Sequence, residues 1–202
     1  MARLGPLSFT GDMSEHANVL TKPQPQPRQV AQAIDRRSFC TLATASAANH
    51  PHVAGVLYEA VGTTLYVSTH RTSKKARNIA RNPHVAVCIP IRRLPVGPPS
   101  TVQFQGTAEI LAADDPRILE LVEAGHLKSI TAHGELDLPD GCFLRITPAG
   151  KVNTYGLGMS LLELRRDPIN AGGSVELTGV PWSGAVAGAG FRQPLLVDRM
   201  GA

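Results

Sequence analysis

The sequence predicts a mainly β protein with flanking helices, built around a small barrel of six antiparallel strands. Six short stretches have the composition of β-strands and are separated by turn signals, and most of the connections between them are local. The sequence lacks the regular alternation of strand and helix that builds a parallel, doubly wound sheet. Short strands with local connections therefore favour a small barrel.

The first three predicted strands follow one another at a spacing of roughly ten residues. A short helical pattern over residues 30–37 leads into FCTLATASA, residues 39–47, which ends at the turn AANHP. PHVAGVLYEA, residues 51–60, is predicted as the second strand, and the turn VGT separates it from the third, TLYVST, residues 64–69. Three such strands in succession indicate an antiparallel meander.

The second half of the chain supplies three more strands and two helices. HVAVCIP, residues 84–90, and CFLRITPAG, residues 142–150, are rich in strand-forming residues. TVQFQGTAEIL, residues 101–111, alternates apolar and polar residues with the period of a half-buried strand. A helix is predicted to begin at Pro116, and LGMSLLELRRDP, residues 157–168, is predicted to form a closing helix.

The length of 202 residues suits one well-buried domain with tails or large loops. The alternating prolines of TKPQPQPRQ favour an extended segment, so residues 1–28 are predicted to be a flexible Pro/Gln-rich tail. Residues 29–170 are predicted to form the barrel domain. Residues 171–202 are a Gly/Ala-rich C-terminal extension to which the sequence assigns no structure.

The composition, with 43% apolar and 18% charged residues, is that of a soluble globular protein. No run of about 18 apolar residues is present, and the N-terminus does not resemble a signal peptide, so we expect a cytoplasmic protein without membrane association. Aromatic residues make up only 4% of the chain, too few for a nucleic-acid stacking surface. The net charge of +4 suits an anionic small ligand.

The cysteine and histidine patterns do not predict a metal site. Cys40, Cys88 and Cys142 are far apart and odd in number, which favours free buried thiols over disulfides and zinc ligands. His50 and His52 have the spacing of two ligands on one strand, but no third ligand can be named. A turn and a surface position are the preferred interpretation of these two histidines.

The helix predicted within STHRTSKKARNIARNPHVAVCI, residues 68–89, has cations in its opening turns. Lys74, Lys75 and Arg77 lie where the partial positive charge of the helix amides favours Asp or Glu. Each such placement costs about 0.3–1 kcal/mol. The pattern is explained if an external anion, with phosphate as the obvious candidate, binds there.

A hydroxyl cap from Thr72 or Ser73 would add a further donor to such an anion site. An ordinary solvated face explains the same lysines equally well, with Ala76, Ile79 and Ala80 as the buried face of the helix. The stretch by itself leaves both interpretations open.

No set of side chains in the sequence forms a recognisable nucleophile and base. The GxG stretches at 156–161 and 188–193 lack the third glycine and the strand–helix context of a dinucleotide fold. Ser160 lacks the GxSxG pattern of a hydrolase. If the protein is an enzyme, a bound cofactor therefore carries the chemistry.

Over residues 30–148 the sequence resembles the FMN-binding split-barrel proteins related to pyridoxamine 5'-phosphate oxidase, including their deazaflavin-using relatives. The resemblance rests on the order FCTLATASAANHPHVAGVLYEA, TLYVSTHRTSKKARNIARNPHVAVCI and VQFQGTAEIL. It implies a split barrel, and a homodimer with the cofactor at its interface. Ser73, Lys74 and Lys75 look like the phosphate-binding turn of the family.

The resemblance also implies further cofactor contacts along three strands. Ser68 and Thr69 match positions near the cofactor phosphate, and Thr101 or Gln103 falls where a polar residue approaches the flavin ring. The strand whose backbone borders the ring is matched by Val53, Ala54, Gly55 and Val56.

The resemblance predicts an oxidoreductase that uses FMN, or alternatively the deazaflavin coenzyme F420, to transfer hydride to or from a small organic substrate. True pyridoxamine phosphate oxidases have basic residues on the second strand where this chain has Val53 and Tyr58, so that activity is not the one expected. KARNIARNPHV also looks like the relatives that bind coenzyme F420. A non-catalytic protein that holds flavin, deazaflavin or haem is the alternative function.

Overall fold

The computed structural model describes residues 25–91 and 100–177. Most of the predicted N-terminal tail, the proline-rich stretch 92–99 and residues 178–202 of the predicted extension lie outside the described residues. No helix among the residues that are described is long and apolar enough to cross a membrane.

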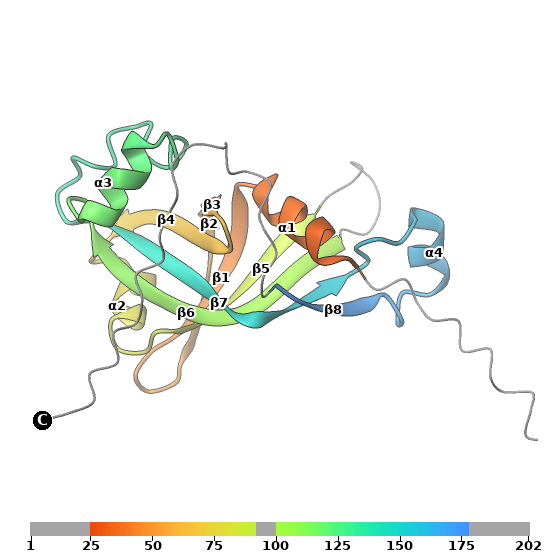
Figure 1. The fold of residues 1–202 in the computed structure, drawn as a ribbon. Helices are drawn as coiled ribbons and strands as arrows, with labels where there is room; N and C mark the ends of the chain where they lie inside the picture. The colour runs from red at the N-terminus through yellow and green to blue at the C-terminus, as the bar shows by residue number, and fades with distance from the viewer. Residues whose placement is uncertain (1–24, 92–99, 178–202) are drawn as a thin grey trace, which may run out of the picture.

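The described chain is mainly β, as predicted, and its strands form one antiparallel sheet (Figure 1). The helices are α1 (Pro27–Asp35), α2 (Lys74–Ile79), α3 (Pro116–Glu123) and α4 (Leu161–Arg166). The strands are β1 (Phe39–Ala45), β2 (Pro51–Leu57), β3 (Glu59–Val61), β4 (Thr64–His70), β5 (His84–Ile91), β6 (Ser100–Ala112), β7 (Gly141–Tyr155) and β8 (Gly172–Glu176).

The sheet curls into a barrel because the two strands at its opposite ends, β2 and β3, follow one another directly in the chain. The strand order is β2-β1-β5-β6-β7-β4-β3, with β8 added to β7. β2 and β3 are consecutive in the chain and are separated only by Tyr58. At Tyr58 the chain stops pairing with β1 and begins to pair with β4, so that this single residue turns the corner that closes the barrel.

The described residues form eight strands, where the sequence predicted six. The predicted second strand is divided into β2 and β3 by the corner at Tyr58. β8 is the other addition, and its GGSVE sequence carries little strand signal because glycine disfavours strands. Because β8 pairs with β7, the sheet continues past residue 170, where the barrel domain was expected to end.

The start of the domain is also earlier than expected. α1 begins at Pro27 rather than residue 30, and Gln26 caps it through a reciprocal pair of hydrogen bonds with Gln29. Proline suits the first helical turn, where its missing N–H is not needed. Residues 27 and 28 of the predicted tail therefore belong to a helix.

The core lies inside the barrel, and a second apolar cluster lies between α3 and the outer face of the sheet. The predicted alternation along β6 is confirmed, since Val102, Phe104 and Ala108 are buried while Gln103 and Gln105 are exposed. The register of β6 against β7 shifts between Phe104 and Gly106. A Cβ on Gly106 would collide with the carbonyl oxygen of Thr147, so this bulge requires glycine.

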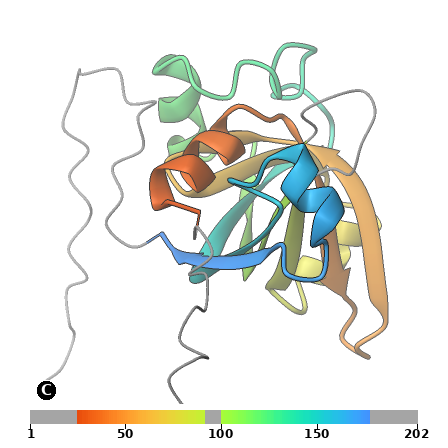
Figure 2. The same ribbon diagram turned by 90° about the vertical axis from the view of Figure 1, so that its right-hand side faces the viewer.

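The two ends of the barrel are covered by different helices, which lie on opposite sides of the sheet (Figures 1 and 2). α1 buries Val30 and Ile34, and the hydroxyl of Tyr58 donates a 2.7 Å hydrogen bond to the Ile34 carbonyl. We call this region the α1 end. The α2 end, where β1 and β4 finish and α2 begins, carries the predicted phosphate-binding residues.

Candidate functional site

The beginning of α2 is organised around the hydroxyl of Ser73. Ser73 is the N-cap of α2, and its Oγ accepts a 3.3 Å hydrogen bond from the backbone N–H of Ala76. Thr69, at the end of β4, donates from its Oγ1 to the same oxygen, also at 3.3 Å. The structure therefore confirms the cap at Ser73 and brings Thr69 to it.

Lys74 and Lys75 follow this cap directly, with Lys74 exposed and Lys75 half-buried. Among the described residues, the hydrogen bonds of the Ser73 hydroxyl do not include Ser68. It precedes Thr69 on β4, and the alternation of the strand turns its side chain to the other face of the sheet. Of the predicted phosphate-binding residues, Thr69, Ser73, Lys74 and Lys75 thus gather at one place.

α2 is a short helix, as predicted, but its bounds change the interpretation of Arg77 and Ala80. With six residues, the helix has Arg77 in its last turn, where a cation is favourable, and not in the opening turns. Ala80 is the C-cap and is exposed, while Asn78 takes the buried position beside Ala76 and Ile79. Anion binding at the α2 end must therefore depend mainly on side chains, because so short a helix has few aligned peptides.

Arg71 is a cation of this site that the sequence reasoning missed. The turn that carries it is held by a 2.9 Å hydrogen bond from the Arg71 N–H to the Asp140 carbonyl. Burial raises the pKa of the Cys142 thiol, and the positive charges of Arg71 and Lys75 act on it in the opposite direction. Since Cys142 lies opposite Thr69 in the β4–β7 pair, both cations lie close to the Thr69–Ser73 corner. The sequence signal was the position of Arg71 two residues before Ser73.

β2 has a backbone edge that no described strand covers. It pairs with β1 along one side, and it contacts α2 and β4 without pairing with either. The N–H and C=O groups of that edge need partners from solvent or from a ligand. Ala54 and Val56 turn their side chains toward the barrel interior, so that β2 offers a ligand mainly its backbone at these positions.

The outer face of β1 and β2 is apolar and exposed. Val53, Leu57 and Phe39 are 62%, 61% and 46% exposed, respectively. The ring of Phe39 lies over Gly55, where an added Cβ would come within 2.9 Å of the ring edge. These side chains form one patch beside the uncovered edge of β2, which we call the outer patch.

Thr101 and Gln103 are not brought to β2 within one chain. Gln103 lies opposite Cys88, Cys88 opposite Thr41, and Thr41 opposite Gly55. Three strand spacings therefore separate Gln103 from Gly55, or roughly 14 Å at about 4.8 Å per strand. The amide of Gln103 donates a 2.9 Å hydrogen bond to the Thr101 hydroxyl. Within one chain, the predicted ring contacts on β2 and on β6 therefore lie on strands that are not neighbours.

The histidines and cysteines form no metal site within the described part of the chain. His50 lies in an exposed turn, as expected. His52 differs from the expected surface position, because its Nδ1 is buried and has no hydrogen-bond partner among the residues described. The three cysteines are free as predicted, with Cys40 and Cys142 buried and Cys88 partly exposed on the outer face.

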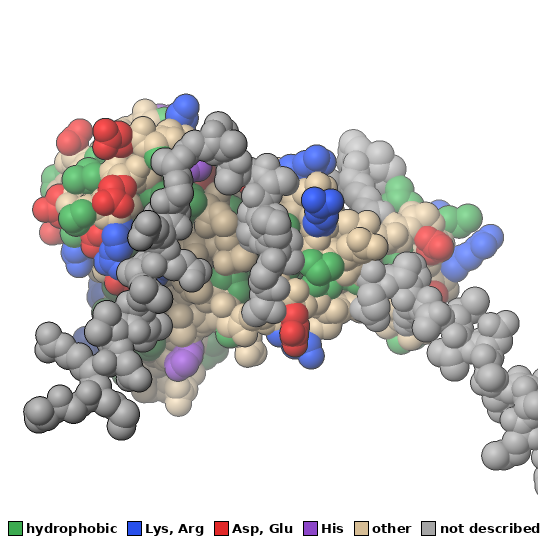
Figure 3. Space-filling view, viewed as in Figure 1, with side chains coloured by type: hydrophobic (Ala, Val, Ile, Leu, Met, Phe, Trp, Pro, Cys, Tyr) green, Lys and Arg blue, Asp and Glu red, His purple; other side chains and the backbone are tan. Residues whose placement is uncertain are grey.

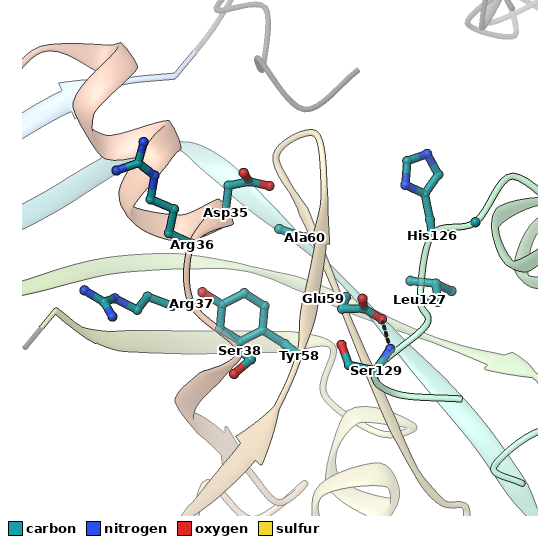
Figure 4. A pocket seen from close by; sticks show the side chains of 11 residues that line it. Asp35, Arg36, Arg37, Ser38, Tyr58, Glu59, Ala60, His126, Leu127 and Ser129 are labelled. Atoms are coloured by element: carbon teal, nitrogen blue, oxygen red, sulfur yellow. Dashed lines mark hydrogen bonds between the residues drawn. The ribbon is translucent and has the colours of Figure 1, made fainter. Parts of the chain in front are cut away.

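A pocket of about 320 Å³ lies at the α1 end, where none of the predicted site residues is found (Figure 4). It has charges of both signs, and its Glu59 carboxylate already accepts a 3.0 Å hydrogen bond from the Ser129 N–H. Figure 4 shows the side chains of Arg36 and Arg37 directed away from Glu59 and Ser129. The pocket therefore lacks the converging cations of an anion site.

Acidic side chains are also unevenly distributed over the surface. Figure 3 shows acidic side chains gathered over α3, and Glu120 and Glu123 on this helix are exposed. By contrast, residues 68–84, which carry the start of α2, contain no Asp or Glu. An anionic ligand is therefore favoured at the α2 end and disfavoured beside α3.

Comparison with known proteins finds one family whose members share this sequence pattern. The family described as pyridoxamine 5'-phosphate oxidase matches residues 26–150, more than half of the chain. No curated protein matches the sequence.

Several solved structures share the fold. A haem-binding protein from Mycobacterium smegmatis is 19% identical with a TM-score of 0.59, and the match covers 76% of this chain but 59% of that protein. The haem storage protein HutZ from Vibrio cholerae is 20% identical, with a TM-score of 0.53 and coverage of 64% and 92%. An FAD-binding protein from Mesorhizobium loti is 21% identical, with a TM-score of 0.51 and coverage of 62% and 91%.

Proposed function

Because the chain belongs to the pyridoxamine 5'-phosphate oxidase family, we propose that it binds FMN, with the phosphate at the start of α2 and the ring along β2. The observation that carries this proposal is the hydrogen-bonded pair of Thr69 and Ser73 directly before Lys74 and Lys75, in a helix that contacts β2. Coenzyme F420, which also carries a phosphate, is the alternative ligand of the same site.

The hydrogen bonds of Ser73 suit a phosphate. A hydroxyl has one donor and two acceptor positions. Ser73 Oγ accepts from the Ala76 N–H and from Thr69 Oγ1, so its own hydrogen is left to donate to a phosphate oxygen. Lys74, Lys75 and Arg71 add charge-assisted contacts, which are stronger than neutral ones.

A homodimer is part of the proposal, because the predicted ring contacts of one chain lie on strands that are not neighbours. Thr101 and Gln103 lie three strand spacings from Gly55 in one chain, and a second copy docked on the outer patch can present its own Gln103 beside β2. Burial of Phe39, Val53 and Leu57 would also stabilise such an interface, at about 25 cal/mol per Å² of apolar area. A Leu57→Lys variant is expected to be monomeric in sedimentation, and an unchanged dimer would contradict this placement.

The proposed activity is that of an FMN- or F420-dependent oxidoreductase acting on a small organic substrate in the cytoplasm. A bound flavin or deazaflavin supplies hydride transfer. The residues of the chain hold the phosphate, fix the plane of the ring against β2 and exclude water from one of its faces.

A non-catalytic flavin-, deazaflavin- or haem-binding protein is the second candidate. It is favoured by the absence of an acid–base pair beside β2 among the described residues, and by the haem-binding and haem storage descriptions of two proteins with this fold. The fold alone does not distinguish the two functions.

The Lys75→Ala variant tests the phosphate site. We expect it to weaken FMN binding by about 1–3 kcal/mol, since one charge-assisted contact is lost. Fluorescence titration with FMN, coenzyme F420 and riboflavin measures this effect, and riboflavin, which has no phosphate, should bind both forms equally. Lys151→Ala, which removes an exposed lysine on β7, is the matched control.

Equal affinities of the wild type for FMN and riboflavin would contradict a phosphate site at the α2 end. Turnover decides between the two functions. Reduction of the bound cofactor by a nicotinamide donor, followed by reoxidation with an organic acceptor, favours the enzyme. Tight binding of FMN, coenzyme F420 or haemin without reduction favours the carrier.

A further inference from the structure

The short helix α2 contains a buried polar residue, Asn78, which is 6% exposed. Its neighbours on the buried side of the helix, Ala76 and Ile79, are apolar. Asparagine is a poor residue for a helix interior, and a buried amide costs free energy unless it is hydrogen-bonded. Leu or Ala would pack better at this position, so packing does not explain why an amide side chain is found there.

The hydrogen bond of Asn78 supplies that reason. Its Nδ2 donates to Oγ1 of Thr44 on β1 at 3.0 Å, and Thr44 is itself only 4% exposed. The Thr44 hydroxyl then donates to the carbonyl oxygen of His52 on β2, at 3.5 Å. Thr44 and His52 lie directly opposite each other in the β1–β2 pair. A short chain of hydrogen bonds therefore joins α2 to β2 through β1.

This chain connects the two halves of the proposed cofactor site. α2 begins with Ser73, Lys74 and Lys75, which we propose hold the phosphate. His52 immediately precedes Val53, the first residue of the segment proposed to border the ring. A six-residue helix is not stable by itself, and apolar contacts alone allow it to rotate or slide on the sheet. A directional hydrogen bond from its buried side restricts that movement.

We propose that Asn78 and Thr44 form a positioning link that holds α2 in one place relative to β2 and so sets the distance between the phosphate-binding and ring-binding parts of the site. This inference rests on the proposed function. Neither residue touches the cofactor in this proposal. The link makes phosphate and ring binding act together, because a ligand that contains both groups fits only one separation.

The test compares FMN with riboflavin in variants of the link. Thr44→Val keeps the shape of the side chain and removes the hydroxyl, and Thr44→Ser keeps the hydroxyl. We expect Thr44→Val to lower FMN affinity about tenfold and to leave riboflavin affinity within about twofold of the wild type. Thr44→Ser should restore FMN binding, and Asn78→Ala should behave like Thr44→Val.

Tyr58→Phe is the matched control, because it also removes one buried side-chain hydrogen bond, at the α1 end. It should lower thermal stability comparably while leaving the preference for FMN over riboflavin unchanged. In a double-mutant cycle, Lys75→Ala should weaken FMN binding less in the Thr44→Val background than in the wild type. Additive effects would overturn the link.

The outcomes separate this inference from the proposed function. If the wild type does not prefer FMN to riboflavin, the phosphate site itself is wrong. If the wild type prefers FMN and Thr44→Val shows the same preference, only the positioning link is wrong. Equal losses of FMN and riboflavin binding in Thr44→Val and Tyr58→Phe would mean that the hydrogen bond serves stability alone.

Discussion

The two ends of the barrel are closed in different ways, although the same sheet runs through both. At the α1 end, Tyr58 and Ile34 meet in a buried neutral hydrogen bond, and burial raises the pKa of Tyr58 above its ordinary value. At the α2 end, hydroxyls and cations surround the start of a short helix. The side chains at an end therefore decide its chemistry, and the barrel itself provides only the frame.

Ile34→Ala should lower the free energy of unfolding more than the other changes, and its structural effect should be confined to the α1 end. Ile34 is 1% exposed, and truncating a buried isoleucine typically costs about 2–5 kcal/mol of unfolding free energy. Chemical denaturation measures this loss. The FMN affinity of the folded variant should equal that of the wild type, and a large loss of affinity would show that the two ends are coupled.

Alkaline pH should give the next largest loss of stability. Burial, together with the nearby Cys88, raises the pKa of the Cys40 thiol from its ordinary 9.0 to about 12. The unfolded chain therefore loses this proton at lower pH than the folded chain, and stability falls as pH rises from about 9 toward 12. At pH 11 this difference in the Cys40 pKa lowers the free energy of unfolding by about 2–3 kcal/mol relative to neutral pH.

Denaturation of the wild type and Cys40→Ala across this range isolates the thiol. The variant starts from lower stability because it leaves a cavity, but its stability should decline less steeply above pH 9. Parallel pH profiles for the two proteins would mean that Cys40 is more accessible to water than the structure shows.

Ionic strength should have the smallest effect, and only at the α2 end. Salt screens exposed charges, so a tenfold rise in NaCl concentration should weaken FMN binding by about threefold. Lys75→Ala should reduce this dependence, and Arg36→Ala, which removes an exposed cation at the α1 end, should not change it. An equal change in both variants would point to general attraction by the net positive charge of the chain.

Much of the fold was accessible from the sequence because local patterns report local structure. The alternation of apolar and polar residues in VQFQGTAEI predicted which side chains of β6 face the core. The hydroxyl before the two lysines predicted the cap at Ser73. The cations of SKKA identified the α2 end as the candidate anion site, and the family match agrees with the resemblance that this segment carries.

Other features depend on contacts between distant segments. No local pattern encodes the corner at Tyr58 or the hydrogen bond from Asn78 to Thr44. The separation of Gly55 and Gln103, roughly 14 Å by strand spacing, likewise depends on the strand order of the whole sheet. Arg71, by contrast, lies only two residues before the Ser73 cap, so local reasoning could have included it.

The sequence by itself determined where most of the strands lie, the cap at Ser73 and the cations beside it, because backbone propensity and side-chain periodicity act over a few residues. The tertiary structure decided which strands are neighbours, which edge of β2 stays uncovered and which polar groups meet inside the barrel. The physical reason is that alternation specifies which face of a strand is buried, while pairing partners are selected by the packing of the whole sheet.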